Sequence, residues 1–287
     1  MKFSSYLSLI KFSHTIFALP FALIGFFLAI HFNATSIDWE KLVYVVLCMV
    51  FARSAAMAFN RYIDQDIDKA NPRTAEIREI PNGTITSKSA LLFVIVNCTL
   101  FITTTYLINP LCFYLSPVAL LVILGYSFTK RFTALCHLIL GLGLSLAPIG
   151  AYLAVTGKFD WLPLFFSFSV LFWVSGFDII YALQDEKFDK TQQLHSIPVL
   201  LGKKNALMIS NILHIITALI ILYAGYYAEL GLFYWIGSSI FIGLLSYQHL
   251  LVKPNDLSKV NLAFFTTNGV ASVLFAVFVL LDLYLVF

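Results

Sequence analysis

The chain alternates long apolar runs with short polar segments. A helix needs about 20 mainly apolar residues to cross about 30 Å of hydrocarbon. The runs that are free of Asp, Glu, Lys and Arg, apart from one Arg53, are Phe12–Ile37, Leu42–Asn60, Ser89–Thr129, Phe132–Gly157, Trp161–Phe177, Asn205–Ala228, Leu230–Val252 and Val260–Leu281. Ser89–Thr129 is long enough for two crossings, with a turn at Asn109 and Pro110. Trp161–Phe177 is expected to continue as helix to about Gln184. The pattern predicts nine transmembrane helices.

Composition supports a membrane protein of the all-α class. Of the 287 residues, 60% are hydrophobic and 11% are charged, whereas about a quarter of a soluble domain is charged. A soluble fold of this size would lack a polar shell. The net charge of +3 comes from the polar loops and indicates no nucleic-acid surface. We expect one transmembrane domain over residues 1–287.

The polar segments are unequal in charge. With the N-terminus in the cytoplasm, the inner segments are 1–11, 61–88, 130–131, 185–204 and 253–259. They hold 15 of the 18 Lys and Arg residues. Basic residues favour the cytoplasmic side, so the chain is expected to span the inner or cytoplasmic membrane with its C-terminus outside.

The first acidic motif, NRYIDQDID, follows an apolar run. Asn60, Asp64 and Asp68 are spaced i, i+4 and i+8, so on a continuous helix they form one stripe. Pro72 disfavours helix at Asn71. We therefore expect the second transmembrane helix to pass the membrane edge and end near Asn71.

The second acidic motif, FDIIYALQDEKFD, stands 121 residues later. Asp178, Asp185 and Asp189 again fall nearly on one face, together with Tyr181. Both stripes lie at predicted inner helix ends, so they can converge on one cleft. Carboxylate and amide oxygens suit Mg²⁺, which often bridges substrate phosphates. The two motifs predict a Mg²⁺ site.

Basic residues flank both stripes. They are Arg73, Arg78, Lys130, Arg131 and Lys187. Carboxylates, a metal ion and basic side chains together describe a diphosphate site. Arg53 lies inside a span, where an ionisable residue is a functional hypothesis by default. It would either pair with Asp178 or receive an anionic substrate.

Two other interpretations stay open at this point. Each charged motif alone fits solvated charge at a membrane edge. A nine-span ion-coupled transporter would also use intramembrane acids, although its charged residues are expected near the midplane at broken helices.

The two motifs resemble the signatures of the UbiA-type intramembrane aromatic prenyltransferases. The first signature matches at Asn60, Asp64 and Asp68, but Arg61 stands where the family usually has Asp, so no metal role is carried to it. The second signature matches at Asp178, Tyr181, Ala182, Asp185 and Asp189. The resemblance covers essentially the whole chain and implies nine helices with a cytosolic active-site cap.

Within that family, FNRYIDQDIDKANPRT, YSFTKRFT and LHSIP look most like the 4-hydroxybenzoate polyprenyltransferase branch, which includes relatives of the futalosine route to menaquinone. The resemblance implies transfer of a polyprenyl group to the ring of an aromatic acid in ubiquinone or menaquinone synthesis. A prenyltransferase for another quinone or haem precursor is the alternative. The acceptor, the prenyl chain length and the oligomeric state stay open.

The resemblance also implies roles for individual residues. Arg53 matches a family arginine that engages the aromatic carboxylate. The catalytic candidates are Lys130, Arg73 and Tyr181. The substrate-binding candidates are Arg53, Arg131, Tyr126, Lys187 and His195. The Mg²⁺ candidates are Asn60, Asp64, Asp68, Asp178, Asp185 and Asp189.

Overall fold

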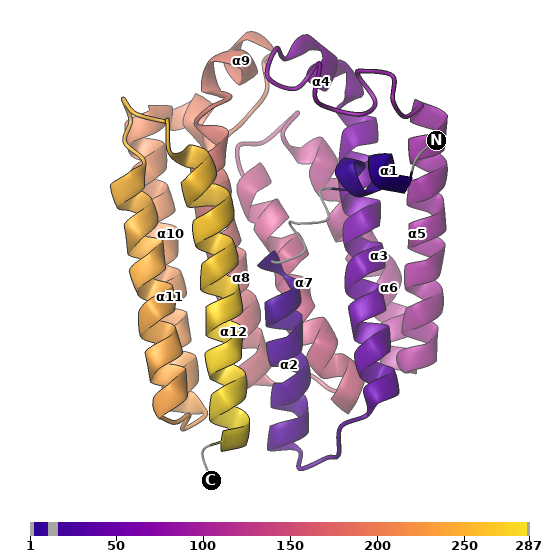
Figure 1. Cartoon of the computed structure of the whole chain (residues 1–287), viewed down its shortest axis with the longest axis vertical. Coiled ribbons are helices and arrows are strands. Elements are labelled where there is room, and N and C mark those ends of the chain that lie inside the picture. Colours follow the sequence, from indigo (N-terminus) through magenta and orange to yellow (C-terminus); the bar gives the residue numbers. More distant parts are fainter. Residues whose placement is uncertain (1–2, 11–16, 286–287) are drawn as a thin grey trace.

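The computed structural model describes residues 3–10 and 17–285 of the chain. Within them, nine helices of at least 14 residues run side by side along one axis (Figure 1). They are α2 (Leu19–Phe32), α3 (Trp39–Ile63), α5 (Ser87–Ile108), α6 (Pro110–Thr129), α7 (Cys136–Thr156), α8 (Trp161–Ala182), α10 (Ile197–Tyr227), α11 (Leu232–Leu251) and α12 (Asn268–Leu285), the last preceded by the π-helix Leu262–Thr267. Helices satisfy their own backbone hydrogen bonds, as an apolar surrounding requires.

Seven of the helices in the described residues are long and apolar enough to cross a membrane, and they confirm an all-helical, multi-pass protein. Helix α2 is apolar but has only 14 residues. Helix α11 carries Gln248 and His249 near its end and is not among the seven. The count of nine crossings stays a prediction.

The first predicted span, Phe12–Ile37, was too long. Helix α2 begins at Leu19 and ends at Phe32, since Ala34 takes a positive φ of 49° that no helix continues. Residues 12–16 lie outside the described part of the chain. The predicted turn at Asn109 and Pro110 is confirmed, because the Asn109 side chain accepts a hydrogen bond from the Cys112 N–H at 2.8 Å and caps α6.

Both acidic motifs lie where a helix breaks. The predicted end near Asn71 is confirmed, because α4 ends at Ala70, but the expected single helix is interrupted at Asp64. Helix α3 ends at Ile63, and Asp64 joins it to the short helix α4 (Gln65–Ala70). In the same way α8 ends at Ala182, and Asp185 precedes the short helix α9 (Glu186–Thr191). Acids one turn apart on a straight helix repel, whereas the turn lets Asp68 pair with Arg78.

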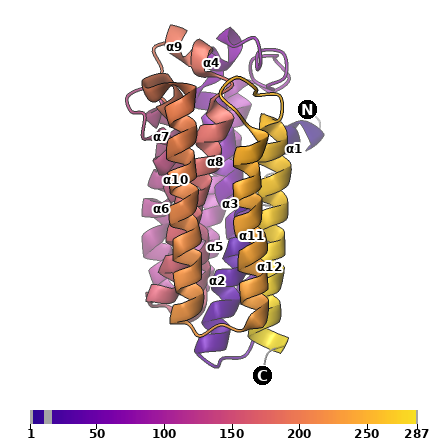
Figure 2. The ribbon, with the colours of Figure 1, turned by 90° about the vertical axis from the view of Figure 1, so that its left-hand side faces the viewer.

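Helices α4 and α9 lie side by side across one end of the bundle in both views (Figures 1 and 2). Helix α1 (Phe3–Leu9) lies at the same end, and α12 finishes at the other. Asn71, which follows α4, donates to Asp185 Oδ1 at 3.3 Å, and Arg73 also bonds Asp185. These bonds tie together two segments that are far apart in sequence.

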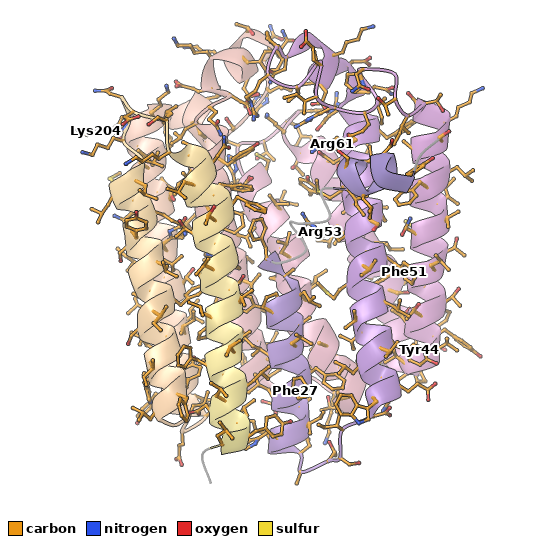
Figure 3. The ribbon with its side chains drawn as sticks, viewed as in Figure 1. Phe27, Tyr44, Phe51, Arg53, Arg61 and Lys204 are labelled. Atoms are coloured by element: carbon orange, nitrogen blue, oxygen red, sulfur yellow. The ribbon has the colours of Figure 1, made fainter. Side chains whose placement is uncertain are left out.

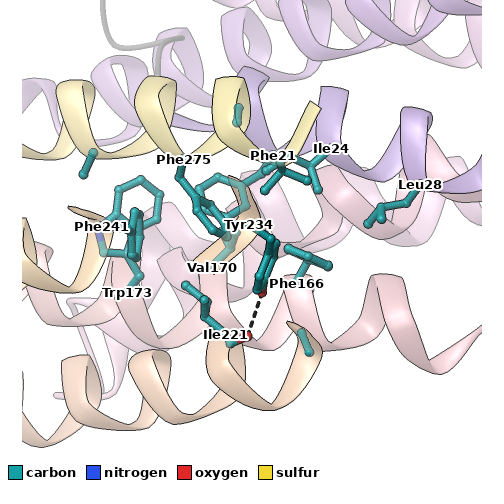
Figure 4. Packing of buried hydrophobic residues seen from close by; sticks show 14 of the residues in the cluster. Phe21, Ile24, Leu28, Phe166, Val170, Trp173, Ile221, Tyr234, Phe241 and Phe275 are labelled. Carbon is teal, nitrogen blue, oxygen red and sulfur yellow. Dashed lines mark hydrogen bonds between the residues drawn. The ribbon is translucent and has the colours of Figure 1, made fainter. Parts of the chain in front are cut away.

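A cluster of aromatic rings joins the second half of the bundle to α2 (Figure 4). Phe21, Trp173, Phe241 and Phe275 are fully buried, with ring centroids between 5.1 and 6.2 Å apart. Tyr234 adds a hydrogen bond from its hydroxyl to the carbonyl oxygen of Ile221 at 2.6 Å. Because lipid is as apolar as these rings, close packing rather than exclusion of water holds the helices together.

Helix α2 crosses α7 so closely that only glycine fits at the crossing. A Cβ atom on Gly25 would lie 2.0 Å from the carbonyl oxygen of Pro148. We expect Gly25→Ala to destabilise the protein by about 1–3 kcal/mol, as overpacking does in a dense interior. The measurement is the apparent melting temperature of the detergent-purified protein.

The matched control is Gly243→Ala on α11, where an added Cβ atom has no neighbour within 4 Å. It should melt at or above the wild-type temperature, since alanine favours helix more than glycine does. Equal melting temperatures for the two variants would contradict the close crossing.

Candidate active site

A cleft of about 190 Å³ lies beneath the two short helices, at the end of the bundle where the acidic motifs are. The six predicted metal ligands, Asn60, Asp64, Asp68, Asp178, Asp185 and Asp189, all line it. Lys130, Arg73, Tyr181 and Tyr126 line it as well. The structure thus brings two motifs from separate halves of the chain to one site.

Each of the five carboxylates that line the cleft lies beside a basic side chain. The pairs are Asp64 with Arg131 at 3.1 Å, Asp178 with His137 at 2.6 Å, Asp189 with Lys130 at 2.8 Å, Asp68 with Arg78, and Asp185 with Arg73. The bases come from the segment after α4, the loop after α6 and the start of α7. The cleft is therefore a mosaic of neighbouring opposite charges.

Arg73 is the most fully bonded of these bases. Its Nε donates to Asp185 Oδ1 at 3.0 Å, a second nitrogen donates to Asp185 Oδ2, and a third donates to the Tyr181 hydroxyl at 3.0 Å. Tyr181 in turn stacks on Phe264, with ring centroids 4.2 Å apart. Phe264 belongs to the π-helix, where Asn268 Nδ2 donates to the Phe264 carbonyl oxygen at 2.8 Å. An irregular turn of helix thereby supports the Tyr181 ring.

Three buried carboxylate oxygens in the cleft have no hydrogen bond within the described residues. They are Asp68 Oδ2 and both oxygens of Asp189, although Asp189 Oδ1 lies 2.8 Å from Lys130 Nζ as an ion pair and Asp68 Oδ1 faces Arg78. Burial raises the pKa of Asp64, the charge of Asp68 raises it further, and Arg131 opposes both. Burial also raises the pKa of Asp189 against the lowering effect of Lys130. The cleft holds more acceptor oxygens than its own donors satisfy.

These residues fit a divalent cation by their chemistry. Carboxylate and amide oxygens are the ligands of Mg²⁺, and an unbonded buried oxygen from each motif is available for a cation. In the described ranges, however, no three acidic, histidine or cysteine side chains already meet as a metal cluster. The cleft carboxylates are instead paired with neighbouring bases.

His137 is a site residue that the pattern of acids did not single out. It is buried, its Nδ1 lies 2.6 Å from Asp178 Oδ2, and its Nε2 accepts from the Ile197 N–H at 3.4 Å. This arrangement places the ring proton on Nδ1, directed at Asp178. The sequence did carry a sign of this role, because His137 is an ionisable residue about one turn inside a predicted membrane-spanning run.

A second, apolar cavity of about 350 Å³ adjoins the cleft, and Tyr126 and Leu140 line both. Arg53 is the one charged residue among the described residues that line this apolar chamber. Figure 3 shows Arg53 reaching from α3 into the bundle, whereas Lys204 points outward.

The Arg53 guanidinium has no acidic partner among the described residues. It makes no hydrogen bond or ion pair with any residue in the described ranges, and its Nε is buried. The resting contact with Asp178 is absent, because His137 occupies that carboxylate. An unpaired guanidinium in an apolar chamber is suited to an anion.

Three substrate-binding candidates lie at the rim or outside the cleft. Arg131 is at the rim and also donates to the Ile63 carbonyl oxygen at 2.8 Å. Lys187 and His195 are exposed and do not line the cleft. The His195 backbone N–H instead donates to the Lys130 carbonyl oxygen at 2.7 Å and so supports the loop that carries Lys130.

Comparison with known proteins gives consistent matches. Residues 18–270 match the UbiA prenyltransferase family. The chain is 32% identical to a 4-hydroxybenzoate octaprenyltransferase of Aliivibrio fischeri, covering 83% of this chain and 82% of that protein. A UbiA homologue from Aeropyrum pernix superposes with a TM-score of 0.84 at 27% identity, over 94% of this chain and 98% of that one.

A second solved structure, a UbiA homologue from Archaeoglobus fulgidus described as bound to DMAPP and Mg²⁺, superposes with a TM-score of 0.74. Its identity is 21%, over 97% of this chain and 99% of that one, so this likeness concerns the fold.

The buried pair of Asp68 and Arg78 yields a stability prediction. Asp68 is 4% exposed, so Arg78→Ala leaves a buried charge alone and should destabilise the protein by about 3–5 kcal/mol. Removing both side chains in Asp68→Ala/Arg78→Ala should restore part of the loss. The check is a double-mutant cycle from unfolding in denaturant.

The exposed pair Lys41 and Asp38, at 3.9 Å, is the control, and Lys41→Ala should cost less than about 1 kcal/mol. Similar costs at the two sites would argue against a buried pair.

Proposed function

The chain belongs to the UbiA prenyltransferase family and is a prenyltransferase, and from that premise we propose its reaction. It transfers the polyprenyl group of a polyprenyl diphosphate to a ring carbon of an aromatic acid, 4-hydroxybenzoate or a related quinone precursor, and releases diphosphate. The observation that carries the proposal is the junction of a charged cleft with an apolar chamber. A polyprenyl diphosphate has the same two parts.

The charges of the cleft can exchange partners when substrate and cation bind. Each acid now faces a base, and a diphosphate with a divalent cation brings charges of both signs. The carboxylates would then turn to the cation and the bases to the phosphate oxygens. Both sets of side chains would keep opposite charges beside them, so the buried groups are never left uncompensated.

The donor set fits Mg²⁺, held by Asn60, Asp64 and Asp68 of one motif and Asp178, Asp185 and Asp189 of the other. The homologue described as bound to DMAPP and Mg²⁺ supports this choice. Bound there, the cation would neutralise charge on the departing diphosphate.

The bases of the chain would act on the bond that breaks. Lys130 and Arg73 line the cleft and would stabilise the diphosphate as the allylic carbon–oxygen bond opens. Tyr181, held by Arg73 and Phe264, offers its ring and hydroxyl beside that point. A ring carbon of the acceptor then bonds to the allylic carbon, and loss of the ring proton restores aromaticity.

Arg53 would orient the acceptor, because its guanidinium has no partner in the described part of the chain and lines the chamber next to the cleft. Ubiquinone and menaquinone precursors are both aromatic acids that fit this contact, and the likeness to 4-hydroxybenzoate octaprenyltransferases favours 4-hydroxybenzoate. The ion-coupled transporter is set aside, since the chain belongs to a family of transferases.

The proposed setting is the inner or cytoplasmic membrane, crossed nine times with the N-terminus inside. The alternation of basic and neutral loops supports this orientation. The cleft, beneath α4 and α9, would then face the cytoplasm, where water-soluble aromatic acids are available.

Activity should require a divalent cation and the cleft acids. We expect excess EDTA to abolish prenyl transfer and added Mg²⁺ to restore it. Asp64→Asn and Asp185→Asn should each lower kcat by about 100-fold or more, since they remove charge where the cation and diphosphate meet. The measurement is pyrophosphate release from a prenyl diphosphate in the presence of 4-hydroxybenzoate.

Asp66→Asn is the matched control for these variants. Asp66 is exposed on α4 between the two motif acids and does not line the cleft. This variant should keep wild-type activity. Full turnover in EDTA, or the same loss for all three variants, would be evidence against the metal-diphosphate site.

Arg53→Ala should raise the acceptor KM about 10- to 100-fold, the loss of a charge-assisted bond of about 1.5–3 kcal/mol. The KM for the prenyl diphosphate should change little. Steady-state kinetics with each substrate varied in turn measure both values. Arg53→Lys keeps the charge and should recover part of the loss.

The control substrate is a phenol without the carboxylate, which wild type and Arg53→Ala should use equally poorly. If the variant is more impaired than wild type with that phenol, Arg53 has a structural role instead.

A further inference from the structure

The apolar chamber follows α7 for a long way from the cleft. Leu140 lines both cavities, and the α7 residues that line the chamber continue to Ala154. At 1.5 Å per residue this distance is about 21 Å. A chain whose diphosphate lies in the cleft would therefore extend beside α7 through much of the bundle.

A stripe of small residues runs along the side of α7 that lines the chamber, between larger Leu and Ile side chains. Gly143, Ala147, Gly150 and Ala154 all line the chamber, and their spacing of i, i+4, i+7 and i+11 puts them on one side of a helix. By this helical spacing, Gly150 falls within the same stripe of α7. Its missing side chain would therefore point at the chamber.

The space in front of Gly150 is open. A Cβ atom added there would have no neighbour within 4 Å, whereas one on Gly143 would already touch Ile123 at 3.6 Å. A side chain at position 150 can therefore start into the chamber without its Cβ atom meeting another helix, and a large one would fill part of the chamber.

Position 150 also lies farther from the cleft than Arg53 does. Along α3, Arg53 is about 10 Å beyond the cleft residue Asn60, while along α7 Gly150 is about 15 Å beyond Leu140. A change at Gly150 should therefore leave the acceptor contact intact and act on a more distant part of the prenyl chain.

We propose that Gly150 determines how long a prenyl chain the chamber accepts. The absence of a side chain at this point leaves the outer part of the chamber open to the later isoprene units. The inference rests on the proposed function and deepens it by assigning chain-length specificity to one residue.

The test compares Gly150→Phe and Gly150→Leu with Gly243→Phe. Gly243, on α11, also has open space around an added Cβ atom but does not line the chamber. Geranyl, farnesyl, geranylgeranyl and a longer polyprenyl diphosphate are offered with 4-hydroxybenzoate and Mg²⁺. The quantity measured is kcat/KM for each diphosphate, together with the KM for the acceptor.

Gly150→Phe should keep kcat/KM for geranyl diphosphate within about threefold of wild type and lose about tenfold or more for the longer chains, as expected for a misfit of several methylene groups. Gly150→Leu should discriminate against the longer diphosphates in the same way, with a smaller loss of kcat/KM for each. Gly243→Phe should keep the wild-type preference, and the acceptor KM should not change in any variant.

Binding measured without turnover distinguishes a failure of the proposed function from a failure of the role assigned to Gly150. The same diphosphates with Mg²⁺ and no acceptor should raise the melting temperature of the wild type, and only the short ones should raise that of Gly150→Phe. If the wild type neither binds nor transfers any of them, the proposed function fails and this inference falls with it. If the wild type is active but Gly150→Phe loses all chain lengths equally, or keeps its preference, Gly150 does not set chain length.

Discussion

Five carboxylates at the edge of an apolar bundle must each have a partner, and this requirement organises the rest of the site. A buried charge without a partner costs several kcal/mol. Four of the acids form ion pairs with Arg73, Arg78, Lys130 and Arg131, and the fifth, Asp178, accepts the Nδ1 proton of His137. These pairs join the segment after α4 to the start of α9, the end of α6 to α9, and α7 to α8, so the electrostatic constraint also closes that end of the bundle.

The breaks at Asp64 and Asp185 follow from the same constraint. The turn folds Asp68 and Asp189 back to where both are buried. One oxygen of each then faces a base, and the other has no donor among residues 3–10 and 17–285. A cleft built in this way is stable at rest and still has free oxygen ligands.

Helix α7 serves as the common wall of the polar and apolar cavities. At its start His137 bonds Asp178 in the cleft, and further along Gly150 opens the chamber. Leu140 lies between them and lines both spaces. A substrate with a charged head and a long apolar tail would thus be gripped along one helix, with Arg53 of α3 on the opposite side near the junction.

Several features were determined by the sequence itself, because they depend on local spacing. The apolar runs located the helices, the turn at Asn109 and Pro110 included, and the two acidic motifs identified the cleft residues. Only the tertiary structure decided the partners. Whether Asp178 pairs with Arg53 or His137 depends on how α3, α7 and α8 cross, and that crossing depends on contacts such as Gly25 against Pro148. The sequence did not predict the breaks at Asp64 and Asp185, because local propensity allows a continuous helix there. The bases that pair with the acids of the turns become their neighbours only in the folded chain.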